Sequence, residues 1–201
     1  MYSVLVLTLP NILTILRITL VPLVVIFMYV EHHKVAWVSA SLFALAGVTD
    51  YFDGYLARRF QSTSHFGRFL DPVADKLLVA SVLLMLAGLG TLQGLALIPA
   101  VIILCREILV SGLREFLAEI AVPLPVTRLA KWKTALQIGA LGFLIWGDPF
   151  PQYLPVPYIG LWGLWGAALL TLVTGYDYLM CGLYHMKAPS STQHQQDESL
   201  I

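Results

Sequence analysis

Long stretches of this sequence carry no charge, and that feature constrains the fold more than any other. No Asp, Glu, Lys or Arg occurs from Leu77 to Leu104, nor from Ile18 to Val30. A transmembrane helix needs ~20 consecutive, largely apolar residues. The whole chain of 201 residues is 58% hydrophobic and only 12% charged, whereas a soluble domain carries ~25% charged residues. We therefore expect an integral membrane protein.

Polar turns, glycines and prolines divide the apolar sequence into six expected spans, which predicts an all-α polytopic membrane protein. The spans cover residues 11–30, 35–49 with the stretch that follows, 77–90, 95 to a break at 122–125, 128–147 and 158–184. The short apolar segment before Pro10 is expected at the membrane interface. We expect one membrane domain over residues 1–187 and a polar, disordered tail over residues 188–201.

The distribution of Lys and Arg predicts which ends of these spans face the cytoplasm. Positive charge gathers in cytoplasmic loops, and here it gathers around the second and fourth connections, as Arg58, Arg59, Arg68, Lys76, Arg128, Lys131 and Lys133. Both termini and the segment 50–75 are therefore expected on the cytoplasmic side. The formal net charge of zero gives no indication of a nucleic-acid partner.

Four carboxylates at the end of the second span form the most informative cluster of the chain. Asp50 and Asp53 are three residues apart, and Asp71 and Asp75 are four apart, so each pair lies on one face of a helix. An ionised carboxylate within a span costs ~2.5–3.5 kcal/mol, and hard divalent cations, which prefer oxygen ligands, could compensate for four of them.

Two such ions, ~3.5–4 Å apart, would hold a diphosphate for in-line displacement. We therefore expect two divalent ions, and carboxylate ligation alone does not distinguish Mg2+ from Mn2+. Two alternatives remain open at this point. The aspartates could be solvated interfacial residues, or they could form a cation or proton relay in a transporter.

The residues around these carboxylates complete a longer pattern. The pattern D-x2-D-G-x2-A-R-x8-G-x3-D-x3-D is matched at every position, by Asp50, Asp53, Gly54, Ala57, Arg58, Gly67, Asp71 and Asp75. It resembles the signature of the CDP-alcohol phosphatidyltransferases, and the resemblance covers roughly residues 10–184. Eight fixed positions at fixed spacing make it a specific signal.

The resemblance implies a role for each part of the pattern. Asp50, Asp53 and Asp71 would be metal ligands, and Asp75 would lie near the metals and act as general base. The cytidine nucleotide pocket would be lined by Gly54, Ala57, Arg58, Thr63 and Gly67, with Asn11, Thr14 and Arg17 closing it. For Arg17, a cation that extends toward the membrane surface is an equally good interpretation. The resemblance also implies a homodimer.

The acceptor alcohol is predicted from a second region of the chain. Arg106 and Arg114 are eight residues apart and so share a helical face, and guanidinium groups suit bidentate recognition of phosphate. The strings REILVSGLREFLAE and KWKT, the latter containing Lys131 and Lys133, resemble the bacterial phosphatidylglycerophosphate synthases. These enzymes join CDP-diacylglycerol to glycerol 3-phosphate and release CMP.

Other interpretations of the second region stay open. The arginines could form structural ion pairs with Glu107, Glu115 or Glu119, and the lysines could be membrane anchors. Another acceptor alcohol, such as inositol phosphate or serine, is also compatible with the family resemblance.

Overall fold

The structure is a computed structural model that describes residues 9–30, 33–60, 65–119, 128–147 and 155–187. Within these ranges, the side chains of residues 9–10, 33–34, 50–60, 65–69, 119, 128, 130, 181 and 184–187 are not described.

All regular structure in the described ranges is helical, which confirms the all-α class. The elements are α1 (Leu9–Tyr29), α2 (His33–Phe60), α3 (His65–Gly88), the 3-10 turn η1 (Gly94–Ala96), α4 (Leu97–Glu119), α5 (Arg128–Trp146) and α6 (Val156–Lys187). As the sequence predicted, α2 continues past its apolar part and carries the first carboxylate pair within the same helix.

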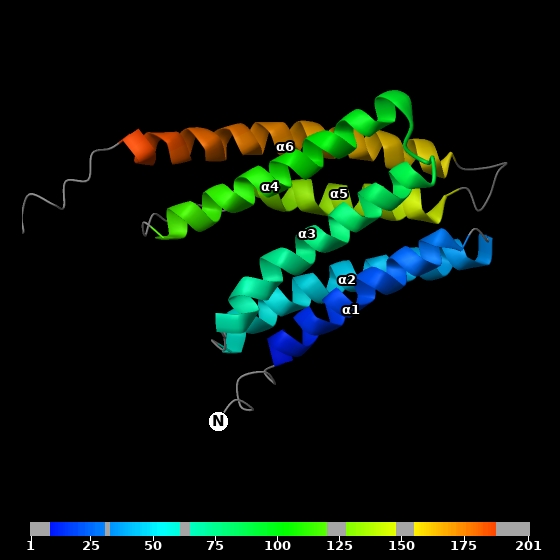
Figure 1. Ribbon diagram of the computed structural model, residues 1–201, viewed down its shortest axis with the longest axis horizontal. Coiled ribbons are helices and arrows are strands. Elements are labelled where there is room, and N and C mark those ends of the chain that lie inside the picture. The colour runs from blue at the N-terminus through cyan, green and yellow to red at the C-terminus, as the bar shows by residue number, and fades with distance from the viewer. Residues whose placement is uncertain (1–8, 31–32, 61–64, 120–127, 148–154, 188–201) are drawn as a thin grey trace, which may run out of the picture.

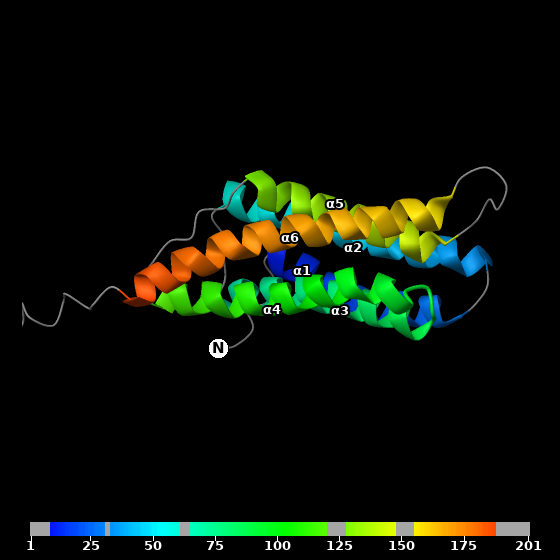
Figure 2. The ribbon, with the colours of Figure 1, turned by 90° about the horizontal axis from the view of Figure 1, so that it is seen from above.

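The helices pack as two groups of three. α1 packs against both α2 and α3, while α6 packs against both α5 and α4. Figure 1 shows the first group below the second, and Figure 2 shows the same helices from above, with their long axes aligned along the molecule. The two groups meet where α2 contacts α5 and where α3 turns into α4.

Each of the six described helices contributes to one hydrophobic core. Each helix places at least one side chain in this core with 0% or 1% exposure. In order from α1 to α6, these side chains include Val24, Phe43, Leu86, Ile103, Leu141 and Leu164. A smaller cluster joins Val110, Leu113 and Leu117 of α4 to Tyr178 of α6. That cluster matters for the site, because it fixes the distance between α4 and α6 where both helices carry polar side chains.

Glycines of α6 allow this helix to pack closely on α5. A Cβ atom at Gly160 would lie 2.8 Å from Leu144 Cγ, and one at Gly163 would lie 3.0 Å from Ala140 Cβ. Small residues at helix interfaces are the usual means by which membrane helices approach each other.

The turn from α3 to α4 depends on glycine. Gly90 and Gly94 have φ angles of +76° and +54°, values that side chains with a Cβ rarely adopt. Both glycines were expected to break the long apolar run, and the structure confirms a turn at this place.

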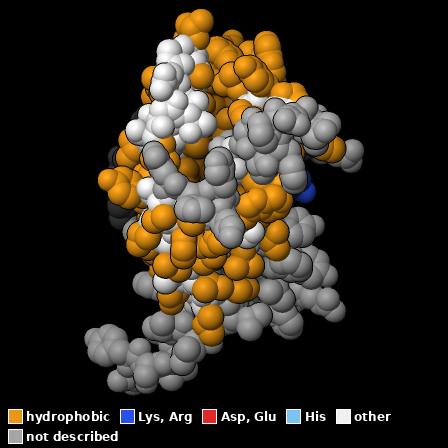
Figure 3. Space-filling model, turned by 90° about the vertical axis from the view of Figure 1, so that its right-hand side faces the viewer, with side chains coloured by type: hydrophobic (Ala, Val, Ile, Leu, Met, Phe, Trp, Pro, Cys, Tyr) orange, Lys and Arg blue, Asp and Glu red, His pale blue; other side chains and the backbone are white. Residues whose placement is uncertain are grey.

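The surface of the bundle is apolar to an extent that fits a lipid environment. Leu84, Leu95 and Trp162 are 74%, 77% and 74% exposed, and large exposed apolar areas mark membrane contacts. In the end view of Figure 3, hydrophobic side chains dominate the described residues, and Lys and Arg are barely visible.

Three helical segments of the described chain are long and apolar enough to cross a membrane. They are Asn11–Tyr29, Gly94–Ala118 and Val156–Met180. The apolar part of α2, Val35–Thr49, is shorter, and α3 and α5 carry charged residues in their first turns. The chain is therefore a membrane-embedded helical protein.

Candidate active site

The second carboxylate pair lies on α3 and is held by side chains of α1. Thr14 Oγ1 donates a hydrogen bond to Asp71 Oδ1 at 2.5 Å. One helical turn further along, Arg17 Nη1 donates to Asp75 Oδ1 at 2.5 Å. The Asp75 side chain is 46% exposed, while that of Arg17 is 1% exposed. The carboxylates thus stand at the edge of the bundle and are anchored from its interior.

The α1 contacts come from a buried polar stripe. Asn11, Thr14 and Arg17 follow one another at intervals of three residues, and all three are almost fully buried. Buried polar groups are costly unless they are bonded, and Thr14 and Arg17 meet this requirement with the carboxylates of α3. The interpretation of Arg17 as a cation extending to the membrane surface is wrong, because its guanidinium lies inside the bundle.

Most of the predicted nucleotide site lies outside the described side chains. Thr63 falls between the described ranges, and for a further set only the helical backbone is described: Asp50, Asp53, Gly54, Ala57, Arg58 and Gly67. Among the described side chains, no group of three or more His, Cys, Asp or Glu could hold a metal ion. The four-carboxylate site therefore stays a prediction, of which the structure describes one pair.

That described pair fits a divalent cation. Asp71 and Asp75 present hard oxygen donors one turn apart on α3, as Mg2+ and Mn2+ prefer. Each carboxylate also receives a hydrogen bond from α1. Outer partners of this kind orient metal ligands and tune their affinity.

A second polar cluster is built around Arg106 of α4. Arg106 Nη2 donates to Thr174 Oγ1 of α6 at 3.0 Å. The Arg106 side chain crosses α6 at Gly175, where a Cβ atom would lie 3.1 Å from Arg106 Cγ. Helix α6 therefore holds the Arg106 side chain in two ways: the Thr174 hydroxyl accepts its hydrogen bond, and Gly175 leaves space for it.

Tyr178 brings the two arginines together. The guanidinium carbons of Arg106 and Arg114 lie 5.7 and 6.0 Å from the centre of the Tyr178 ring, within the range of a cation–π interaction. The prediction that Arg106 and Arg114 share one face of a helix is confirmed. Arg114 is exposed, whereas the Arg106 side chain is only 11% exposed.

Glu107 lies between cations from two helices. The buried Lys133 of α5 donates to Glu107 Oε1, and Arg106 Nη1 lies 3.6 Å from the same oxygen. The structural ion pair considered as an alternative for Arg106 therefore exists, and Lys133, considered as an anchor, also pairs with Glu107. Arg106 and Lys133 thus share the one negative charge of Glu107, and Arg114 adds a third cation at the Tyr178 ring.

The two lysines predicted to act together have different environments. Lys133 is buried in the cluster, while Lys131 is exposed. Residues two apart do not face each other on a helix, so only one of them reaches the interior. The structure thus joins Arg106, Arg114 and Lys133, and it does not bring Lys131 into this group.

A cavity lies between α3, which carries Asp71 and Asp75, and the part of α4 that carries Glu107. It has a volume of about 240 Å³ and lies between α3 and α4, with Pro72, Val73 and Lys76 on one side and Glu107 and Ser111 on the other. Of the cationic cluster, Glu107 lines this cavity, whereas Arg106, Arg114 and Lys133 do not, and neither do Asp71 and Asp75. The two carboxylates contact α1 instead, so the cavity lies between the two helices and does not join the two groups of charges.

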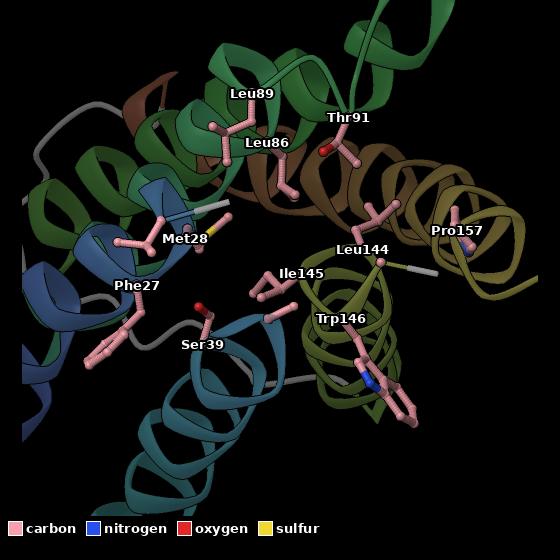
Figure 4. Close-up of a pocket in the computed structure, with 13 residues that line it drawn as sticks. Phe27, Met28, Ser39, Leu86, Leu89, Thr91, Leu144, Ile145, Trp146 and Pro157 are labelled. Carbon is pink, nitrogen blue, oxygen red and sulfur yellow. The ribbon is translucent and has the colours of Figure 1, made fainter. Parts of the chain in front are cut away.

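A larger cavity of about 500 Å³ lies at the other end of the bundle (Figure 4). Met28, Leu86 and Ile145 point into it from α1, α3 and α5, and Ser39 and Thr91 lie at its walls. Its described lining includes no Asp, Glu, Lys or Arg. Such a cavity offers no group for acid–base chemistry or for binding a diphosphate.

Three residues of the cationic cluster were not identified from the sequence. Thr174, Gly175 and Tyr178 all lie on α6. Their spacing puts the Thr174 hydroxyl, the space left by Gly175 and the Tyr178 ring on one side of the helix. A polar, a small and an aromatic residue at these offsets in an apolar span are a weak signal, since packing alone also explains them.

Comparison with known proteins agrees with this geometry. The family model for CDP-alcohol phosphatidyltransferase matches residues 7–173. Three similar proteins are named CDP-diacylglycerol--glycerol-3-phosphate 3-phosphatidyltransferase. The one from Rickettsia typhi is 46% identical over 85% of this chain and 94% of its own. The one from Cereibacter sphaeroides is 38% identical over 90% and 97%, and the one from Haemophilus influenzae is 40% identical over 85% and 90%.

The fold and the site define a membrane-embedded helical protein with a carboxylate pair on α3 and a cationic cluster between α4, α5 and α6. With the match over most of its length, the chain belongs to the CDP-alcohol phosphatidyltransferase family.

Proposed function

We propose that this protein transfers the phosphatidyl group from CDP-diacylglycerol to sn-glycerol 3-phosphate, giving phosphatidylglycerol phosphate and CMP. The observation that carries the proposal is the cluster of Arg106, Arg114 and Lys133 between α4, α5 and α6, whose Glu107 lines a cavity shared with α3. The names of the similar proteins support the same reaction.

The charge of the cluster suits an acceptor that carries a phosphate group. Arg106, Arg114 and Lys133 carry three positive charges against the one negative charge of Glu107, which leaves an excess of two. The charges of Lys76 and Glu115, which also line the cavity at Glu107, cancel each other. A phosphate monoester carries about −1.5 to −2 at neutral pH, so its binding would neutralise the cluster. A neutral alcohol would gain nothing from this excess charge.

The carboxylates would organise the other substrate. We propose that Asp50, Asp53, Asp71 and Asp75 hold two divalent ions, Mg2+ or Mn2+, with Asp75 also near enough to act on the acceptor. The ions would neutralise the diphosphate of CDP-diacylglycerol and stabilise the charge that develops on the leaving CMP. The nucleotide would lie along α2 and the start of α3, against Gly54, Ala57, Arg58, Thr63 and Gly67.

Asp75 is the proposed general base. Its carboxylate would accept the proton of the glycerol 3-phosphate hydroxyl while the hydroxyl oxygen forms a bond to the phosphorus that carries diacylglycerol. The bond from this phosphorus to the oxygen of CMP breaks, and CMP leaves with the electron pair. The 46% exposure of the Asp75 side chain supports this role, since a base must be reachable by the acceptor.

The setting of the site follows from the same proposal. We propose that all six helices span the membrane within one domain over residues 1–187, as a homodimer in a bacterial inner membrane. The site would face the cytoplasm, where a soluble acceptor and a lipid-linked nucleotide both arrive. The apolar surface of the described helices supports a transmembrane arrangement.

An acceptor screen tests the function. Purified protein in detergent is given CDP-diacylglycerol and Mg2+ or Mn2+ with glycerol 3-phosphate, inositol phosphate, serine or glycerol in turn, and release of CMP is measured. We expect metal-dependent release with glycerol 3-phosphate. Release only with another alcohol would contradict the acceptor assignment.

An Asp75→Asn variant serves as the matched control for the chemistry. We expect it to lose turnover by at least about 100-fold, as for a residue of general base catalysis, while it still binds the nucleotide. If neither form releases CMP with any acceptor, the transferase proposal fails, and a cation relay through the four aspartates becomes the better interpretation.

A further inference from the structure

Helix α1 contacts both helices that carry the predicted metal ligands. It packs along α2, which bears Asp50 and Asp53, and along α3, which bears Asp71 and Asp75. Figures 1 and 2 both show α1 next to these two helices. A side chain on the inner face of α1 is therefore well placed to set the position of a carboxylate.

Two such contacts are made, and their spacing matches. Thr14 and Arg17, three residues apart on α1, reach Asp71 and Asp75, four residues apart on α3. A rise of ~1.5 Å per residue separates the first pair by ~4.5 Å and the second by ~6 Å along their helices. One face of α1 thus contacts both carboxylates of α3 at the same time.

The burial of these α1 side chains argues against direct contact with a substrate. Thr14 and Arg17 are each 1% exposed, and the Thr14 hydroxyl already donates to Asp71. We infer that Thr14 and Arg17 are positioning residues, which act through Asp71 and Asp75 and do not bind the nucleotide. This inference rests on the proposed function in one respect, the assignment of Asp71 and Asp75 to metal binding and of Asp75 to the general base.

The two contacts differ in what they provide. A guanidinium fixes one carboxylate oxygen of Asp75 against the interior of the bundle by a charge-assisted bond, so that the exposed part of the carboxylate keeps one direction. The hydroxyl of Thr14 fixes the orientation of Asp71 in the same way without adding charge. Loss of an outer partner typically costs a metal site about 10- to 100-fold in affinity or activity.

The first test compares Thr14→Val with Thr14→Ser and Thr19→Val. Valine keeps the shape of threonine without the hydroxyl, serine keeps the hydroxyl, and Thr19 is exposed on the same helix with its hydroxyl bonded to Ile15 O. Binding of Mn2+ alone to the purified, substrate-free protein is measured by electron paramagnetic resonance. We expect Thr14→Val to weaken Mn2+ binding about tenfold, Thr14→Ser to restore most of that loss, and Thr19→Val to have no effect.

The second test separates positioning from nucleotide binding at Arg17. Arg17→Gln should lower kcat about 10- to 100-fold, with the KM for CDP-diacylglycerol changed less than about threefold. Arg17→Lys, which keeps the positive charge, should recover part of kcat. The Thr14 variants keep the inference testable even if Arg17→Gln does not fold.

Two results would overturn the inference. One is unchanged Mn2+ binding in Thr14→Val together with weaker binding of CMP, which would make α1 a wall of the nucleotide pocket. The other is wild-type protein that binds no Mn2+ at all. If the wild type binds Mn2+ and Thr14→Val weakens it, but no acceptor yields CMP, the inference holds and only the proposed transferase function fails.

Discussion

The position of Arg106 depends on a residue that has no side chain. A methyl group at Gly175 would lie 3.1 Å from Arg106 Cγ and 3.5 Å from its Nε, so the arginine would have to shift by a few tenths of an ångström. A displacement of ~1 Å in a positioning group costs about 100-fold in rate, and a smaller shift costs less. We expect Gly175→Ala to raise the KM for glycerol 3-phosphate about three- to tenfold.

Gly112→Ala is the control for that change, because a Cβ at Gly112 of α4 would meet no atom within 4 Å. The two variants are compared by steady-state kinetics with each substrate varied in turn. Equal KM values for glycerol 3-phosphate in both variants would show that α6 does not position Arg106.

Glu107 stabilises a cluster in which Lys133 is buried and Arg106 is largely buried. Removing one partner of a buried ion pair destabilises a protein by about 3–5 kcal/mol, and partial exposure of Glu107, 21%, reduces this cost. We expect Glu107→Gln to lower the thermal unfolding temperature, and glycerol 3-phosphate to raise that temperature more in the variant than in the wild type. The added phosphate would replace the lost negative charge.

Asp177→Asn, at an exposed position of α6 that lines neither cavity, should change neither temperature. Thermal unfolding is followed with and without glycerol 3-phosphate. A Glu107→Gln protein that responds to the ligand no more than the wild type would mean that the phosphate binds elsewhere.

At the scale of residues, the sequence predicted which side chains carry charge but not which of them meet. Spacing alone places Arg106 and Arg114 on one face, and the structure agrees. Thr174 lies 68 residues from Arg106 in sequence, and nothing in local spacing indicates that contact. The same limit applies to Thr14 and Asp71, because the packing of α1 on α3 is a property of the whole bundle.

At the scale of elements, helix order was predictable because each boundary has a local cause. The glycines of the α3–α4 turn, the polar start of α5 and the apolar length of α6 were all visible in the sequence. The number of spans is a harder question, since α3 and α5 combine apolar length with charged first turns. Further along, α3 carries Asp71 and Asp75 and α5 carries Lys133. These charges belong to the proposed site, so function weakens the membrane signal of both helices.

Close packing of α5 on α6 makes a separate prediction. A Cβ at Gly160 would lie 2.8 Å from Leu144 Cγ and 3.1 Å from the backbone oxygen of Ala140, and a backbone atom cannot move aside cheaply. We expect Gly160→Val to destabilise the protein by about 1–3 kcal/mol, measured as the free energy of unfolding in mixed detergent. Gly142→Val, where a Cβ would meet nothing within 4 Å, should cost less; equal losses would contradict this packing.

At the scale of the whole molecule, the proposed six spans put both chain ends on one side of the membrane. We expect alkaline phosphatase fused after Gly90 to be active, because this turn would lie outside the cytoplasm, and green fluorescent protein fused after Lys187 to be fluorescent. If only the three segments that are apolar by length and composition crossed the membrane, the two chain ends would lie on opposite sides. Inactive phosphatase after Gly90 would contradict the proposed topology.

The whole molecule also separates two tasks in space. The carboxylates of α2 and α3, supported by α1, would handle the lipid-linked nucleotide, and the cluster between α4, α5 and α6 would select the acceptor. Arg106 joins α4 to α6 by its hydrogen bond to Thr174, and both Arg106 and Arg114 contact the Tyr178 ring. The central claim is that this cluster recognises the phosphate of the acceptor.

The most direct test compares glycerol 3-phosphate with glycerol as acceptors for wild-type protein and Arg106→Gln. A hydrogen bond to a charged group contributes about 1.5–3 kcal/mol, so the ratio of the two kcat/KM values should fall about 10- to 100-fold in the variant, with the KM for CDP-diacylglycerol nearly unchanged. An unchanged preference for glycerol 3-phosphate over glycerol in Arg106→Gln would contradict the account.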